Sequence, residues 1–271
     1  MALTADTSEW TKPSQGGTKP KGGIDWLEDR VKARKVEREI PTKEDAPGES
    51  TLDLLTRAWV ALDEDRDRSQ QTEIGPSGLG GCRRQTFFKL VGQSPINFVD
   101  GEPMDRQGAL IGTAVHDHAE QAINKLKDEN LFTEITLPGI PGLLADGHTD
   151  LYRKDQKKIV DWKTPKKKNL RFFPGEQYRW QGQVYGYLAI KAGYEVEWVE
   201  IIGIVKDGAF TDNVSHVERY DEAIAVKALD WLRQRQAEAL NGEIPPADYS
   251  GRICSEYCSF YGKDLCLGKG K

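Results

Sequence analysis

Residues 147–165 read GHTDLYRKDQKKIVDWKTP, and this stretch decides the fold. Two short runs of strand-forming residues flank a polar turn, which is typical of a β-hairpin. A two-residue turn centred on Asp155 and Gln156 would place Asp150 directly opposite Asp161, with their Cβ atoms about 5 Å apart. Because side chains alternate along a strand, Lys163 points to the same face as Asp161. The hairpin therefore predicts two carboxylates and one ammonium group in a small volume.

Two facing carboxylates repel each other unless a cation lies between them. Hard oxygen ligands at this separation suit Mg²⁺ or Mn²⁺, and Lys163 would then orient or deprotonate a nearby water molecule. The alternative is a surface hairpin with ordinary solvated charges. Two polar pairs on predicted helices favour a site, because each pair is four residues apart beside an apolar stripe: His116 with Glu120, and Gln181 with Tyr185.

The composition is that of a soluble globular protein, with 271 residues, 38% hydrophobic and 30% charged. No run approaches the roughly 20 apolar residues that a membrane helix needs. The first residues lack the basic start and apolar core of a secretory signal, so we expect a cytoplasmic protein, in the host cytoplasm if it is virally encoded. A net charge of −5 argues against a uniformly basic surface, although a local basic groove suffices for nucleic acid.

Three regions follow from the patterns along the chain. Residues 1–23 are polar and predict a disordered tail, and residues 24–73 predict a helical extension with a linker. Residues 74–271 predict the folded body. There the sequence indicates a helical stretch carrying Cys82, strands near 133–137, 143–152, 158–164, 196–205 and 210–217, and helices near 113–126, 176–192 and 221–241. This order predicts an α/β fold with a mixed sheet flanked by helices.

The four cysteines are unevenly placed. Cys82 stands alone, whereas Cys254, Cys258 and Cys266 crowd the C-terminal end. Structural disulfides are rare in the cytosol, so the cysteines do not predict covalent bridges, and three of them within thirteen residues argue against unrelated positions. The spacing of the last three differs from the paired C-x₂-C of most zinc sites. Four unrelated cysteines are the alternative.

The ordered series GTAVHDHAE, GHTDLY, KKIVDWKT and QGQVYGYL resembles the motifs of the RecB-like branch of PD-(D/E)XK nucleases. With GCRRQTFF upstream and three cysteines downstream, the chain is similar to the CRISPR-associated iron–sulfur exonucleases and to the AddB nuclease domain. The resemblance spans about residues 74–267. It implies a restriction-endonuclease-like core with a cysteine-ligated iron–sulfur subdomain, and hydrolysis of DNA to 5′-phosphate products.

The resemblance also implies a role for each matching residue. The implied ligands of Mg²⁺ or Mn²⁺ are His116, Asp150, Asp161 and the backbone carbonyl of Trp162. The implied catalytic residues are Lys163, Asp150, Asp161, Gln181, which orients the lysine or the water, and Tyr185, near the scissile strand. The implied ligands of a 4Fe–4S cluster are Cys82, Cys254, Cys258 and Cys266. The chain departs from the family pattern at Thr149, where the superfamily name places a proline, and at Asp161, where Glu is commoner.

The basic stretch TPKKKNLRFF follows Lys163 directly. It favours a wall of a DNA groove, in which Phe172 and Phe173 stack on bases and the phosphate-binding residues are Lys166, Lys167, Lys168 and Arg171. A solvated loop explains the charges equally well. The expected partner is single-stranded DNA or DNA ends, in recombination and repair, viral DNA metabolism or CRISPR adaptation, and a homo-oligomer is left open.

Two other classes compete with this interpretation. A metal-dependent HD phosphohydrolase needs a histidine upstream of the HD pair, and none of the four histidines precedes His116. A non-catalytic DNA-binding relative would use the cysteines for structural zinc and keep the carboxylates as remnants. Iron content and metal-dependent nucleotide release separate that relative from an exonuclease.

Overall fold

The computed structural model describes Leu54, Leu55 and Ala58, then residues 73–93, 98–99, 102–103, 107–262 and 265–270. From residue 73 on, the described residues belong to one compact unit, Ala61–Lys271. The tail predicted for 1–23 and most of the extension predicted for 24–73 lie outside the described residues. No described helix combines the length and apolar character needed to cross a membrane.

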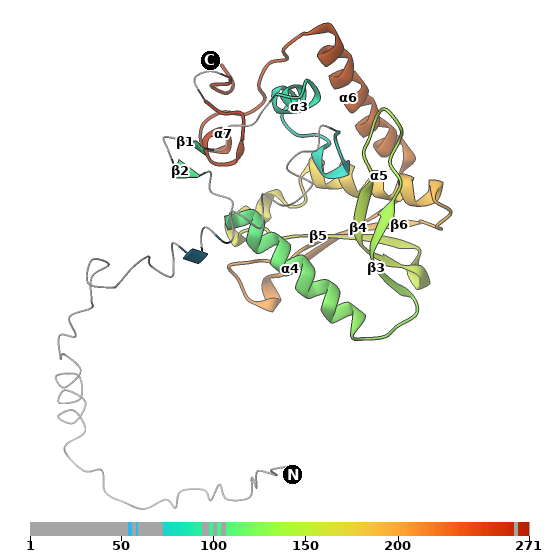
Figure 1. Cartoon of the computed structure of the whole chain (residues 1–271). Coiled ribbons are helices and arrows are strands. Elements are labelled where there is room, and N and C mark those ends of the chain that lie inside the picture. Colours follow the sequence, from blue (N-terminus) through green and yellow to red (C-terminus); the bar gives the residue numbers. More distant parts are fainter. Residues whose placement is uncertain are drawn as a thin grey trace, which may run out of the picture. The chain divides into compact units, whose positions relative to one another are not determined.

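The centre of the unit is a five-stranded mixed sheet with the strand order β3-β4-β5-β6-β7 (Figure 1). The strands are β3 Leu131–Leu137, β4 Gly147–Arg153, β5 Lys158–Lys163, β6 Trp198–Gly203 and β7 Val214–Arg219. The neighbours β5 and β6 run parallel, and the other neighbouring pairs run antiparallel. The predicted mixed α/β architecture is confirmed.

The described helices are α3 Arg83–Leu90, α4 Gln107–Asn124, α5 Glu176–Lys191, α6 Glu222–Asn241 and α7 Arg252–Tyr257, and a short pair of strands is formed by β1 Phe98–Val99 and β2 Glu102–Pro103. Helix α5 connects β5 to β6, since parallel neighbours need a crossover connection. Helix α6 matches its predicted range: Asp221 caps its first turn through the Ala223 N–H, and Gly242 ends it at φ +68°.

One predicted helix boundary is wrong. The sequence predicted that this helix starts at Thr113 as its N-cap, but helix α4 begins at Gln107, so Thr113 lies inside the helix. The preceding residues Ala109, Leu110 and Ile111 are compatible with helix and contain no proline, and they extend it by six residues at its start. A threonine is favoured as a cap but is tolerated in a helix interior, which explains the error.

The two faces of the sheet have different hydrophobic clusters. Tyr152 and Ile159 pack with α5 and α6, whereas Leu151, Val160 and Trp162 form a cluster with partly buried residues of α4. Neighbouring residues of β5 thus point to opposite faces, as the alternation predicts.

The predicted register of the β4–β5 hairpin is also correct, because Leu151 pairs with Val160 and Tyr152 with Ile159. The turn itself is longer than predicted. It contains a 3-10 turn, Lys154–Gln156, and Lys157 in the left-handed region at φ +49°. The pairing of the strands is nevertheless as predicted, because the longer loop is still centred between Asp155 and Gln156.

Helix α5 lies unusually close to the sheet at Gly182. A Cβ atom there would lie 2.6 Å from Cγ1 of Val199 on β6. The glycine therefore lets the helix backbone approach the strand, and this approach places the polar residues of α5 over the end of β5.

We expect Gly182→Ala to lower the free energy of unfolding by about 1–3 kcal/mol, because the new methyl group overpacks the interface between helix and strand. Gly75→Ala is the matched control: its φ is −84°, and its nearest neighbour would lie 3.8 Å from the added Cβ. Urea unfolding of both variants measures the difference. Equal stabilities would show that α5 has room to move.

Candidate active site and cysteine cavity

The candidate active site lies where β4 and β5 separate. Regular pairing ends at Leu151 and Val160. Beyond that pair, Thr149 Oγ1 donates to the Val160 carbonyl at 3.2 Å, and the Trp162 N–H donates to Asp150 Oδ2 at 2.7 Å. Side chains of β4 therefore replace its backbone as partners of β5. We call these residues, Thr149, Asp150, Asp161 and Trp162, the β4–β5 fork.

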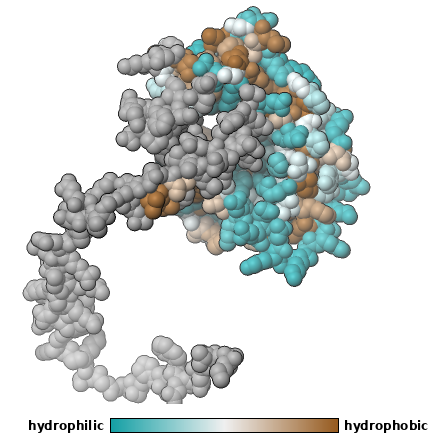
Figure 2. Space-filling view, in the orientation of Figure 1, coloured by the Kyte–Doolittle hydropathy of each residue, from teal (hydrophilic) through white to brown (hydrophobic). Residues whose placement is uncertain are grey.

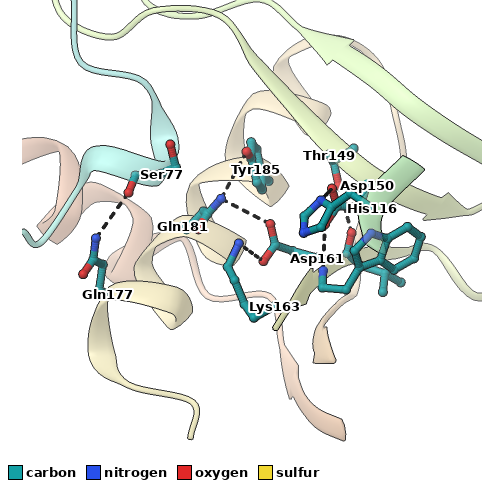
Figure 3. A network of polar contacts seen from close by, with 11 residues as sticks. Ser77, His116, Thr149, Asp150, Asp161, Lys163, Gln177, Gln181 and Tyr185 are labelled. Atoms are coloured by element: carbon teal, nitrogen blue, oxygen red, sulfur yellow. Dashed lines mark hydrogen bonds and ion pairs between the residues drawn. The ribbon is translucent and has the colours of Figure 1, made fainter. Parts of the chain in front are cut away.

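Residues from both faces of the sheet converge on the β4–β5 fork (Figure 3). From α4, His116 Nδ1 lies 3.1 Å from Asp150 Oδ1. From α5, Gln181 Nε2 donates to Asp161 Oδ1 and to the Tyr185 hydroxyl, both at 3.2 Å. Lys163 Nζ lies 2.5 Å from Asp161 Oδ2. The structure thus brings together the side chains that the sequence singled out for catalysis.

Both carboxylates of the fork are buried, with Asp150 5% and Asp161 2% exposed. Burial raises the pKa of Asp161 to about 6; the nearby Asp150 charge adds to the rise and the Lys163 ammonium opposes it. Burial acts to lower the pKa of His116, but the hydrogen bond and charge of Asp150 outweigh it, so the net shift is upward. Burial therefore disfavours the charged form of Asp161 even though the Lys163 ammonium lies beside it.

The donor atoms fit a divalent cation in part. Asp161 Oδ2 is buried and pairs with Lys163 Nζ at 2.5 Å, and a carboxylate oxygen has a second lone pair that a metal ion could use. Asp150 Oδ1 and His116 Nδ1 are close enough to share an ion. Across the described ranges, however, no three His, Cys, Asp or Glu side chains already form a metal-binding group. Among the described residues, the fork is therefore not a preformed metal site.

Tyr178 is a member of this site that the sequence reasoning missed. Lys163 Nζ lies 5.4 Å from the centre of its ring, close enough for a cation–π contact. Tyr178, Gln181 and Tyr185 follow one another at helical spacing, so the signal was available in the sequence.

The basic stretch after Lys163 is mostly exposed. It contains the 3-10 segment Lys167–Phe172, where Arg171 lies over the Phe172 ring at 4.7 Å and Phe172 is 67% exposed. Lys167 pairs with Asp212 at 2.7 Å, and its N–H bonds Asp207. Phe173 packs against Tyr178. The exposed groups available to a ligand here are therefore Lys166, Lys168, Arg171 and Phe172.

A second feature is a cavity of about 130 Å³ whose lining includes Cys82, Cys254, Cys258 and Cys266. Cys82 is the N-cap residue of α3, and Cys254 lies on α7. Burial raises the pKa of the Cys254 thiol, and the neighbouring Cys82 and Cys266 raise it further. Cys266 Sγ accepts from the Gly268 N–H at 3.4 Å and from Arg84 Nη1 at 3.6 Å. The structure places all four cysteines around one cavity, but among the described residues no three of them already form a metal-binding group.

Polar contacts also hold the C-terminal segment to α3. Arg83 donates to both carboxylate oxygens of Asp248, with its backbone N–H at 2.7 Å and its side-chain Nε at 2.8 Å. Arg84 Nε donates to the Pro245 carbonyl at 2.9 Å. The sequence did not predict the Arg83–Asp248 pair, because residues 165 positions apart give no local signal.

Hydrophobic side chains are exposed near the same end of the molecule. At the top of Figure 2 they gather over the C-terminal end of α6, whereas most of the rest of the coloured face is hydrophilic. Leu240 is 88% exposed and Ile244 61%.

Comparison with known proteins places the fold. No protein-family model matches the chain, and no curated protein matches it. The solved structure of SSO0001 superposes with a TM-score of 0.50 and 16% identity, covering 82% of this chain and 99% of that one. An alkaline exonuclease from Laribacter hongkongensis, LHK-Exo, has a TM-score of 0.46 and 12% identity, covering 65% of this chain and 92% of its own.

A phage-related exonuclease from Haemophilus somnus 129PT is less similar, with a TM-score of 0.36 and 13% identity over 60% of this chain and 82% of its own. The likeness to SSO0001 concerns the fold alone. The chain therefore has the mixed α/β fold of that structure, and the two exonuclease similarities are too low to add to this conclusion.

The raised pKa of Asp161 predicts a pH-dependent stability. Between its ordinary value of 3.8 and about 6, the folded state binds a proton that the unfolded state has released. In chelator, wild type should therefore lose on the order of 2–3 kcal/mol relative to Asp161→Asn as the pH rises through this window. Urea unfolding at several pH values measures the difference. A difference independent of pH would mean that Asp161 titrates normally.

Proposed function

We propose that the chain is a metal-dependent DNA exonuclease of the PD-(D/E)XK type. One observation carries the proposal: His116, Asp150, Asp161, Lys163 and Gln181 converge on the β4–β5 fork from four separate elements. Facing buried carboxylates cost stability, so a structural role alone does not explain them. The order of these residues along the chain matches the RecB-like motif series.

The cation site would use His116, Asp150, Asp161 and the Trp162 carbonyl. Carboxylate and carbonyl oxygens suit Mg²⁺ or Mn²⁺, and a cation bound there would neutralise the buried charge, polarise the phosphate and lower the pKa of water. The hydrogen bond from the Trp162 N–H holds Asp150 in place for this role. Asp161 Oδ2 already pairs with the Lys163 ammonium, so a metal ion there would share this carboxylate with Lys163.

The remaining residues position the reactants. The Lys163 ammonium, held between Asp161 and the Tyr178 ring, would hold the attacking water and stabilise charge on the phosphoryl oxygens. Gln181 links Asp161 to Tyr185, so it fixes the orientation of the carboxylate. Tyr185 is only 5% exposed, so direct contact with the DNA strand would be limited to the margin of the site. Its main role here would be to hold Gln181 through their hydrogen bond.

The exposed basic stretch would receive the DNA. Lys166, Lys168 and Arg171 lie within eight residues of Lys163 and would contact phosphates, and Phe172 is placed to stack on an unpaired base. Unpaired bases favour single-stranded DNA or frayed ends as the substrate. Lys167 contributes less, because Asp212 already neutralises it.

The cysteine cavity would hold a 4Fe–4S cluster. The number of thiols that line the cavity matches the ligand demand of a cluster, and donors to Cys266 Sγ resemble the hydrogen bonds that stabilise cluster sulfurs. A bound cluster would favour the thiolates of Cys254 and Cys258, which burial disfavours. Hydrolysis needs no electron transfer, so we assign the cluster a structural role: it would join α3 to the C-terminal segment.

The nuclease assignment predicts that Asp150→Ala and Asp161→Ala each reduce metal-dependent release of nucleotides by at least 10²-fold, since each removes a ligand. Lys163→Ala should reduce turnover similarly but leave the affinity for Mn²⁺ intact. The assay uses end-labelled single- and double-stranded DNA with Mg²⁺ or Mn²⁺, and Lys154→Ala, in the hairpin turn, is the control. Near wild-type cleavage by either aspartate variant would refute the site.

The cluster assignment predicts brown, anaerobically purified protein with about four iron atoms per chain. Replacing any one of the four cysteines by Ala should bleach the visible absorption and lower the melting temperature. Stoichiometric zinc without iron would refute the cluster and favour a structural zinc protein. A Cys82→Ala variant that keeps its full metal content would refute the shared site.

A further inference from the structure

Glu134 has an unusual backbone for the middle of a strand. Its φ is +48°, in the left-handed region that residues with a Cβ atom disfavour. The register pairs Thr133 with Leu151 and Ile135 with Thr149, so Glu134 stands opposite Asp150 of the fork. Glutamate is not among the residues enriched in this region, which are Asn, Asp and His. Such backbone strain is found where the surrounding structure imposes it, often at functional sites.

At this position the side chains of β3 change the face of the sheet to which they point. In a regular strand, residues two or four apart share a face. Leu131 nevertheless packs with the α4-side cluster of Leu151, Val160 and Trp162, whereas Ile135 and Leu137 pack with the α5-side cluster. The inversion therefore falls between Leu131 and Ile135, and Glu134 is the residue in this interval with a left-handed backbone.

The side chains of β4 change faces of the sheet at the same level as those of β3. Leu151 belongs to the α4-side cluster, but a Cβ atom at Gly147, four residues earlier, would lie 2.8 Å from Cε1 of Tyr185 on α5. The inversion of β4 thus lies between Gly147 and Leu151, the interval that contains Thr149 and Asp150. These are the two residues that bond β5 through their side chains and not through the regular ladder.

We propose that Glu134 is a positioning residue, whose left-handed backbone turns β3 and β4 over and so holds the Asp150 carboxylate in the β4–β5 fork. This inference rests on the proposed metal-dependent nuclease function. The carboxylate needs this help because a side chain of a regular β4 would point to one face of the sheet. Here it reaches between β4 and β5 to the Trp162 N–H and on to His116 of α4.

The test compares substitutions at Glu134 that differ in their tolerance of a positive φ. Glu134→Gly and Glu134→Asn accept it, whereas Glu134→Val does not. All three remove the glutamate side chain, so its own contacts cancel from the comparison. We expect the Gly and Asn variants to keep the half-saturating Mn²⁺ concentration for DNA cleavage within about twofold of wild type. The Val variant should raise it by about tenfold or more, with a smaller change in the rate at saturating Mn²⁺.

Lys127→Val is the matched control. Lys127 also has a positive φ, +53°, but it is exposed in the turn after α4. Its substitution should lower stability without changing the half-saturating Mn²⁺ concentration. A merely structural role of Glu134 would make the two Val variants behave alike, and a folded Glu134→Val protein with wild-type Mn²⁺ dependence would overturn the inference.

Two further measurements keep the test decisive. If Glu134→Val does not fold, Glu134→Thr, which is also β-branched, replaces it, and a half-saturation equal to that of Glu134→Gly would overturn the inference. Calorimetric titration with Mn²⁺ alone reports the affinity without DNA. Wild-type protein that binds Mn²⁺ but cleaves no DNA would refute the nuclease, and the same titration of the variants would still decide the role of Glu134.

Discussion

The separation of β4 from β5 is the constraint on which the rest of the structure depends. A buried N–H needs an acceptor, and at Trp162 that acceptor is a carboxylate oxygen of Asp150 in place of a strand carbonyl. The hydrogen bond ties the carboxylate to the sheet, so the backbone fixes its position. Asp161 comes one residue before Trp162 and is equally buried. Two carboxylates are thus held away from solvent, and a cation bound between them would stabilise their charged forms.

The helices complete the site from opposite sides of the sheet. His116 reaches the fork from α4, whereas Gln181 and Tyr185 reach it from α5, whose close packing depends on Gly182. Helix α5 also borders the cysteine cavity: Gln177, one turn before Gln181, lines the cavity and donates to the Ser77 carbonyl at 3.2 Å. Helix α5 therefore contacts both the candidate catalytic centre and the cavity lined by the cysteines.

Much of this arrangement was predictable from the sequence, for local reasons. Alternation and a polar turn determine the hairpin register, and helical spacing puts Gln181 and Tyr185 on one face. The start of α4 was not predictable, because Thr113 is a good cap in a segment that prefers to continue as helix. The Arg83–Asp248 pair depends on a long-range contact. Glu134 has no signal at all, since its backbone is imposed by both strands and contradicts its own preference.

The most direct measurement is a crystal structure of the protein grown with Mn²⁺, with anomalous diffraction collected to locate the metal. We expect one strong peak in the β4–β5 fork, within about 2.0–2.4 Å of oxygens of Asp150 and Asp161, with His116 and the Trp162 carbonyl as further ligands. The peak should vanish in Asp161→Asn crystals. An empty fork at millimolar Mn²⁺, or a peak that binds only surface carboxylates, would contradict the assignment of the buried aspartates as a catalytic metal site.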